Sequence, residues 1–289
     1  MTYILHQIIM ISIYLVLVYA TNLVTGLGGL MTMAQAAFYG IGAYTYALVA
    51  LNFHPGFVES CGLSLIIAGF VAWLLSKVVL RFRGETFVLA TLAFQMIVFT
   101  ILDNWESVTG GSYGLSEIPR PSVLGWEVST VPEYVLLSVI VAALITGVFW
   151  VMLNSPFGLS VRAVRDNEKA AESLRISPQK QLSRAFVISA VLASLAGCFF
   201  ASYVTYIDPT SFSLTESIFI LCILLVGGSG NLIGPFLGVL FMILFPEGLR
   251  FLGLPDESAA NIREIVYGTI LIVLMYYRPN GFKGIYSVK

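Results

Sequence analysis

The chain has 289 residues, of which 58% are hydrophobic and only 11% are charged. Because so little polar surface could not cover a core, this composition excludes a soluble globular protein and indicates an integral membrane protein. A net charge of −1 argues against nucleic acid as a partner, since neutralising phosphates requires a clustered excess of Lys and Arg. The three cysteines are scattered and form no CxxC pair, so neither a disulfide framework nor a metal site is expected.

Hydrophobic runs define the candidate membrane spans, because a helix needs about 20 apolar residues to cross the hydrocarbon. Six clear runs lie near residues 6–24, 62–80, 86–104, 133–153, 185–205 and 262–278. Three others, 30–52, 213–226 and 232–245, are short or interrupted by glycine, and the last two could be full spans or re-entrant segments. We therefore predict an all-α, polytopic membrane protein of about 8–10 transmembrane helices with glycine-broken segments, forming a single domain over residues 1–289.

The distribution of charge predicts an orientation. If all nine segments cross, with the N-terminus outside and the C-terminus in the cytoplasm, 12 of the 15 basic residues fall on the cytoplasmic side. This is the bias that the positive-inside rule describes. The 103–132 loop, which carries four acidic residues against the single Arg120, would then be external. We predict a multi-pass protein of a bacterial-type cytoplasmic (inner) membrane.

Two glycine-rich interruptions resemble one another: the first break, residues 26–30, and the second break, residues 228–232. Each joins an inward-running segment to an outward-running one. Paired interruptions of this kind point to a duplicated architecture with the transport path at the repeat interface. Close helix packing is the alternative explanation for the glycines. We predict that the two breaks face one another across the path, or across an interface between two membrane subunits.

Polar side chains within spans usually face protein or a water-filled path, because an unsatisfied polar group in hydrocarbon is costly. The candidates for a translocation path are Thr32, Gln35, Tyr44, Thr91, Gln95 and Asn231. For each, an interhelical hydrogen bond worth roughly 1 kcal/mol is the alternative. No ionisable residue is expected at mid-span, so proton or sodium coupling finds no support and the energy source should lie elsewhere.

The longest polar interval, residues 155–184, holds six of the 15 basic residues. Pro156 and Pro178 bracket it, since proline cannot donate the backbone hydrogen bond that a continuing helix needs. Apolar residues recur at helical spacing, which predicts one amphipathic helix or two short ones with an apolar face formed by Val161, Val164, Ala171 and Leu174. An ordinary solvated loop whose basic residues only set membrane orientation is the alternative.

The chain carries no recognisable catalytic apparatus. No Gly-Lys dipeptide occurs, so a phosphate-binding loop is excluded and the chain cannot be its own ATPase. Neither HExxH nor GxSxG is present, and we expect no catalytic residue, no metal site and no cofactor bound by this chain. A tight external turn with many backbone donors is predicted at Thr109, Gly110 and Gly111. The alternative is a simple turn that closes a long connection.

These features together resemble the permease subunits of branched-chain amino-acid ABC importers, a family that also includes urea and short-chain amide importers. The resemblance runs through most of the chain and rests on four stretches: residues 29–44, residues 91–94, the Thr109-Gly110-Gly111 turn and residues 162–171. The last stretch, Arg-Ala-Val-Arg-Asp-Asn-Glu-Lys-Ala-Ala, is the most specific. Thr32, Met33 and Ala34 depart conservatively from the usual early signature.

The resemblance implies a set of partners. The 155–184 segment would be a cytoplasmic coupling loop that docks on ABC ATPase subunits carrying ATP-Mg, through Arg162, Arg165, Asp166, Asn167, Glu168, Ala170 and Ala171. A second permease subunit, commonly a paralogue, and an external or periplasmic solute-binding protein that meets the 103–132 loop would complete the importer within the lipid bilayer. The solute would be small and uncharged or zwitterionic, with branched-chain amino acids the first expectation and urea or short-chain amides the alternative. A stand-alone channel or facilitator is the competing class.

Overall fold

The computed structural model describes residues 2–53, 56–123, 126–128, 130–250, 268–269 and 281–284. Six helices in these ranges are long and apolar enough to cross a membrane. The predicted span 262–278 lies outside the described residues apart from 268 and 269. The six long helices are α1 (Thr2–Thr21, continued by the π-helical η1, Asn22–Leu27), α2 (Gln35–Phe53), α3 (Phe57–Val79), α4 (Glu85–Asn104), α6 (Val131–Asn154) and α9 (Pro178–Val204).

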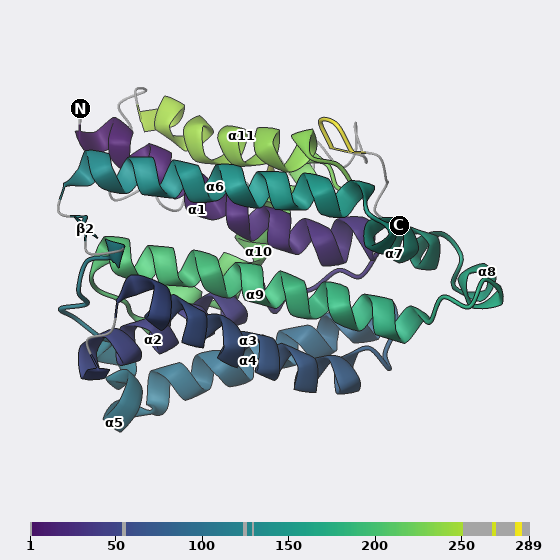
Figure 1. The fold of residues 1–289 in the computed structure, drawn as a ribbon, viewed down its shortest axis with the longest axis horizontal. Helices are drawn as coiled ribbons and strands as arrows, with labels where there is room; N and C mark the ends of the chain where they lie inside the picture. The colour runs from purple at the N-terminus through teal and green to yellow at the C-terminus, as the bar shows by residue number, and fades with distance from the viewer. Residues whose placement is uncertain are drawn as a thin grey trace.

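Shorter elements lie between and after these helices. They are α5 (Glu106–Thr109), η2 (Gly111–Tyr113), β1 (Ser122–Val123), β2 (Trp126–Glu127), α7 (Pro156–Asp166), α8 (Glu168–Ser173), η3 (Pro209–Phe212), α10 (Leu214–Gly227) and α11 (Ile233–Arg250). The strands β1 and β2 form one small antiparallel hairpin. All the other elements named here are helices, so the all-α prediction is confirmed. Helices α7 and α8 lie at one end of the bundle, while α5 and β2 lie at the opposite end (Figure 1).

Helix α9 is the centre of the bundle and packs against α1, α2 and α3. Helices α1, α2 and α9 are mostly buried, whereas α3, α4 and α6 expose most of their length. Small residues permit this packing: a Cβ added at Gly42 would lie 2.2 Å from the Ser194 carbonyl oxygen, and one at Gly197 would lie 2.1 Å from the Tyr39 carbonyl oxygen. Apolar helices in a bilayer associate through such close backbone contact, because lipid offers no hydrophobic drive between them.

The predicted spans agree with the structure wherever the chain is regular. The runs near 6–24, 62–80, 86–104, 133–153 and 185–205 are all helical. The 30–52 segment differs, because its helix begins only at Gln35; the preceding chain is non-helical, and Gly29 has a φ of +71°, which favours glycine. Helix α10 has only 14 residues, fewer than the roughly 20 that a full crossing requires.

The 155–184 segment forms two helices rather than one. Pro156 and Pro178 occupy the first turns of α7 and α9, as their chemistry predicts. The break falls at Asn167, whose backbone is extended and whose side chain caps α8 by accepting from the Ala170 N–H at 3.1 Å. Three residues of the predicted apolar face, Val161, Val164 and Ala171, are buried. Leu174 is 73% exposed, because the helical period of α7 does not continue across Asn167.

Candidate functional site

Helix α7 contacts the first break directly. The Ser155 hydroxyl caps its start by accepting from the Gly158 N–H at 3.2 Å, and Val161 and Val164 are buried beneath it. At its last turn the Arg165 guanidinium donates a hydrogen bond to the Gly26 carbonyl oxygen, near the end of η1. A Cβ added at Gly29 would lie 2.8 Å from the Arg165 Cγ. The amphipathic helix α7 therefore packs directly against the first break.

The two breaks contact each other within this single chain. The Asn22 side chain joins them: its Nδ2 donates to the Asn231 carbonyl oxygen at 2.8 Å, and its Oδ1 accepts from the Gly230 N–H at 2.8 Å. A Cβ on Gly26 would lie 2.8 Å from the Gly230 nitrogen. The breaks thus face one another as the sequence predicts, but in direct contact rather than across an open path or an interface between two permeases.

Asn231, a predicted path residue, is engaged within the second break. Its Oδ1 caps α11 by accepting from the Gly234 N–H at 2.7 Å, and its Nδ2 donates to the Lys283 carbonyl oxygen. Both ends of the side chain amide therefore have backbone partners. The prediction that Asn231 lines the path finds no support in this arrangement, which explains the residue as the cap of a helix that must start inside the bundle.

A layer of polar side chains surrounds the start of α2. The Gln35 Nε2 donates to the Ser189 hydroxyl at 2.8 Å, and that hydroxyl donates to the Ala20 carbonyl oxygen at 2.6 Å. Gln35 is 3% exposed, yet its Oε1 has no hydrogen-bond partner among the described residues. A buried amide oxygen without a partner is uncommon in a folded protein, so this atom is the strongest candidate in the layer for contact with a solute.

Thr91 and Gln95 lie on one buried face of α4, as their spacing predicts, and both side chains have partners within the chain. The Met33 N–H donates to the Thr91 hydroxyl at 3.1 Å, which fixes the non-helical segment before α2. The Gln95 Nε2 donates to the Phe212 carbonyl oxygen at 2.8 Å, and its Oε1 accepts from the Ser217 hydroxyl at 3.2 Å. The contact between Gln95 and Ser217 is an interhelical hydrogen bond, the alternative to a path residue, and the other two contacts hold non-helical or 3-10 segments against α4.

Ser217 is a residue that sequence reasoning missed. Besides donating to Gln95, its hydroxyl accepts from the Ala36 N–H at 3.0 Å, one of the free donors in the first turn of α2. A single serine therefore joins α2, α4 and α10. No signal in the sequence separates it from the other serines of the apolar segments, because its partners lie 122 and 181 residues away.

Thr32 and Tyr44 differ in how fully their hydroxyls are used. The Thr32 hydroxyl accepts from the Ala34 N–H at 3.2 Å and so belongs to the turn that starts α2. The Tyr44 hydroxyl is buried without a hydrogen-bond partner in the part of the chain that the structure describes. Its ring lies edge-on to Phe212, with centroids 5.8 Å apart. The Tyr44 hydroxyl thus offers unused hydrogen-bonding capacity beside η3, nine residues along α2 from Gln35.

Glu216 lies in the first turn of α10, the end position that the sequence predicts for an ionisable residue, but its side chain reaches another helix. This carboxylate accepts a hydrogen bond at 2.7 Å from the hydroxyl of Tyr14, a residue in the interior of α1. The first turn of α10 follows η3 and is only partly buried, with Thr215 exposed.

The other residues of the predicted coupling set occupy α7 and α8. Glu168 pairs with Arg83, from the connection between α3 and α4, at 2.5 Å. Ala171 is buried, whereas Asp166 and Ala170 are exposed. The Arg162 Nε is buried without a hydrogen-bond partner among the described residues. The set therefore divides into members that attach the helix pair to the bundle and members that face outward.

The predicted Thr109-Gly110-Gly111 turn lies at the end of the bundle opposite α7. Thr109 is 3% exposed, and its hydroxyl donates to the carbonyl oxygens of Leu102 and Trp105, at 2.7 and 2.8 Å. Gly110 has a φ of +75°, and a Cβ there would lie 2.1 Å from the Gly114 carbonyl oxygen. The turn thus folds the chain tightly over the end of α4, and its threonine faces inward.

These features define a class of protein: a multi-pass α-helical permease whose broken helices contact an amphipathic helix pair at one end. Comparison with known proteins identifies the family. A model of the branched-chain amino acid transport system / permease component family matches residues 3–275, and the chain belongs to that family. It lies in the inner membrane, as its family and its apolar helices indicate.

The relatives agree with this assignment. The chain is 31% identical to the high-affinity branched-chain amino acid transport system permease protein LivM of Escherichia coli, over 93% of this chain and 67% of the relative. It is 24% identical to the probable branched-chain amino acid transport permease protein LivM of Methanocaldococcus jannaschii, over 88% and 80%. It is 27% identical to the autoinducer 2 import system permease protein LsrC of Photorhabdus laumondii, over 80% and 68%. No solved structure matches the chain.

Proposed function

We propose that this chain is the membrane subunit of an ATP-driven importer of branched-chain amino acids. It forms the path of the solute, and its conformational change is coupled to ATP hydrolysis by separate ATPase subunits. The observation that carries the proposal is the hydrogen bond from Arg165 to the Gly26 carbonyl oxygen. This hydrogen bond connects α7 and α8, which lie at the surface where a partner could bind, to the first break between α1 and α2. Membership of the permease family and the two LivM relatives support the choice of substrate class.

In this mechanism α7 and α8 dock on a cytoplasmic ABC ATPase, and ATP-Mg is bound and hydrolysed by that partner. Movement of α7 displaces Gly26 through Arg165, and Asn22 passes the displacement to Gly230 and the start of α11. The ion pair between Glu168 and Arg83 carries the same movement to α3 and α4. The protein then alternates between two arrangements whose populations the ATPase biases through its different contacts with each.

The solute passes beside the polar layer at the start of α2. The Gln35 Oε1 and the Tyr44 hydroxyl have hydrogen-bonding capacity that no described residue uses. An amide oxygen accepts hydrogen bonds, so Gln35 suits the ammonium group of a zwitterionic amino acid. The apolar and aromatic side chains of Phe38 and Phe212, both buried in this region, suit a branched aliphatic side chain.

The orientation places the end of the bundle with α7 and α8 in the cytoplasm and the end with α5 outside. The N-terminus is then outside and the C-terminus in the cytoplasm. A solute-binding protein meets the 103–132 loop, and a second permease subunit covers part of the apolar surface that α3 and α6 expose, which includes Phe70, Leu144 and Trp150. The 155–184 segment is the coupling loop of a single permease domain over residues 1–289.

Reconstitution of the chain with the ATPase subunits and the solute-binding protein of its importer tests the proposal. We expect leucine, isoleucine and valine each to raise ATP hydrolysis and to enter proteoliposomes only when ATP is supplied. Urea, acetamide and autoinducer 2 are the competing solutes, and stimulation by one of them alone would reassign the substrate. Uptake that proceeds at the same rate without ATP or the ATPase would identify a facilitator and overturn the coupling.

A further inference from the structure

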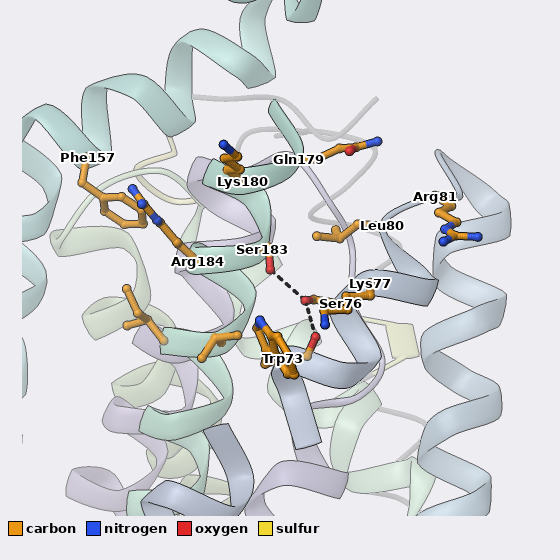
Figure 2. Close-up of a pocket in the computed structure, with 12 residues that line it drawn as sticks. Trp73, Ser76, Lys77, Leu80, Arg81, Phe157, Gln179, Lys180, Ser183 and Arg184 are labelled. Carbon is orange, nitrogen blue, oxygen red and sulfur yellow. Dashed lines mark hydrogen bonds between the residues drawn. The ribbon is translucent and has the colours of Figure 1, made fainter. Parts of the chain in front are cut away.

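A groove at the α7 end of the bundle gathers basic side chains without a described acidic partner. It has a volume of about 690 Å³ and lies between the end of α3 and the start of α9, beside Phe157 of α7. Lys77 and Arg81 line one wall, and Lys180 and Arg184 line the other (Figure 2). None of the described residues that line it is acidic. We call it the basic groove.

The spacing of these cations is unfavourable unless an anion is present. Arg81 lies just beyond α3, which ends at Val79, whereas Lys180 and Arg184 are four residues apart within the helix α9. Like charges at this spacing project to the same side and destabilise a helix by repulsion. Charge alone would set membrane orientation equally well on any exposed face, so convergence on one groove calls for a further explanation.

The groove also contains the start of a helix. The hydroxyl groups of Ser76 and Ser183 between its two walls are hydrogen-bonded to the protein (Figure 2): Ser76 donates to the Trp73 carbonyl oxygen at 2.8 Å and lies 2.7 Å from the Ser183 hydroxyl. Gln179 and Lys180 belong to the first turn of α9, where free backbone N–H groups and the helix dipole favour an anion. A phosphate group matches this combination of cations and a helix N-terminus.

The inner part of the groove is apolar, which distinguishes a lipid from a soluble anion. Val187 and Ile188 line it one to two turns further along α9, and Trp73 lines it on α3. The Lys77 Nζ lies 3.3 Å from the centroid of the Trp73 ring, an arrangement of cation and aromatic ring suited to the boundary between headgroups and hydrocarbon. Trp73 is 45% exposed, and its neighbours Phe70 and Leu74 continue an exposed apolar face into the membrane.

We propose that the basic groove is a binding site for an anionic phospholipid. Its phosphate lies between the Lys77–Arg81 and Lys180–Arg184 pairs, and an acyl chain follows Trp73, Val187 and Ile188. Basic sites between membrane helices recognise anionic headgroups through this charge complementarity. A lipid held there bridges α3, α9 and the start of α7, so it stabilises the position of α7. The inference requires only that the chain lies in a bilayer and is independent of the substrate and of ATP coupling.

Lipid binding to the purified chain tests the site. Phosphatidylglycerol is added to protein in neutral detergent, with phosphatidylcholine of the same chain length as the comparison, and the thermal midpoint and the bound lipid in native mass spectra are measured. We expect phosphatidylglycerol to raise the midpoint and to bind more tightly. The double variant Lys180→Gln/Arg184→Gln should weaken its binding by about 25-fold, since each cation at an anionic surface contributes roughly fivefold.

The matched control is Lys169→Gln/Arg175→Gln, which removes two exposed cations of the same end outside the groove. This variant should still bind phosphatidylglycerol more tightly than phosphatidylcholine, as the unmodified chain does. Equal binding of the two lipids by the unmodified chain would overturn the proposal even if the groove variant failed to fold. A preference that survives in the groove variant would exclude this groove, and an equal stabilisation by inorganic phosphate would exclude a lipid.

A photoreactive residue introduced at Gln179 identifies the occupant in the assembled transporter. Gln179 lines the groove and is exposed, but it is not one of the four cations. Illumination in native membranes should give an adduct with the mass of an anionic phospholipid. An adduct with the second permease or with an ATPase instead would show that the groove is a protein interface and would overturn the lipid assignment.

Discussion

The Arg165 guanidinium donates its hydrogen bond to the Gly26 carbonyl oxygen, 139 residues earlier in the chain. This carbonyl belongs to η1, where the helical hydrogen bonds of α1 have already widened to the π pattern. Carbonyl groups at the end of a helix lack partners within the helix and accept readily from a cation. The Arg165 side chain of α7 thus supplies a hydrogen-bond donor to the end of η1, which continues α1.

This contact predicts the effect of removing the guanidinium. Arg165→Ala should lower ATP-dependent uptake by roughly 5- to 150-fold, the range of typical coupling energies, while membrane abundance stays the same. ATP hydrolysis should lose its response to solute. Arg175→Ala, which removes an exposed cation next to α8, is the matched control and should transport normally. Normal uptake by Arg165→Ala would refute the coupling role.

The ion pair between Arg83 and Glu168 is predicted to matter for coupling and not for stability. Both side chains are exposed, 39% and 43%, and exposed pairs contribute only about 0.2–1 kcal/mol. Glu168→Arg should therefore leave the thermal midpoint nearly unchanged but reduce uptake. The exchanged double variant Arg83→Glu/Glu168→Arg should recover transport, and failure of this rescue would show that the pair does not position α8.

Gln35 and Gln95 provide a test that separates path from packing. Gln35→Leu removes an amide whose Oε1 has no described partner, so uptake should fall or change its solute preference at constant abundance. Gln95→Leu removes hydrogen bonds to Phe212 and Ser217, each worth roughly 1 kcal/mol, so the thermal midpoint should fall. If Gln35→Leu transports normally, the residue serves packing alone.

Close helix contact predicts where added volume is tolerated. Gly42→Val would force a side chain against the Ser194 backbone, 2.2 Å from its nearest atom, and should cost about 1–3 kcal/mol or prevent assembly. Gly147→Val on α6 is the control, since no atom lies within 4 Å of its added Cβ. Abundance and thermal midpoint in membranes measure the difference. Equal losses for both variants would contradict the packing described for α2 and α9.

The proposed orientation is tested by cysteine labelling in a background without Cys61, Cys198 and Cys222. Ser112→Cys lies at the α5 end, where Ser112 is exposed and donates to Asp103 at 2.9 Å, and should react with an impermeant thiol reagent from outside. Ser173→Cys on α8 should react only after the cytoplasmic side is opened. Labelling with the opposite pattern would invert the orientation.

Much of this protein is determined by the sequence alone because the bilayer imposes local requirements. A spanning helix must be long and apolar, so hydropathy located α4 and α6 within about two residues and found α3 and α9, which begin about five and seven residues before the predicted spans. Proline lacks a backbone donor, so Pro156 and Pro178 marked the starts of two helices. The extended backbone at Asn167 interrupted the period on which the placement of Leu174 depended.

Only the tertiary structure decided which polar residues have partners. Asn22 joins positions 208 and 209 residues away, and Ser217 reaches both α2 and α4. From the sequence, Gln35, Gln95 and Asn231 looked equivalent, but Gln95 and Asn231 are satisfied within the chain and Gln35 keeps an unused oxygen. Hydrogen-bond satisfaction depends on atoms brought together by packing, and helical periodicity carries no information about distant partners.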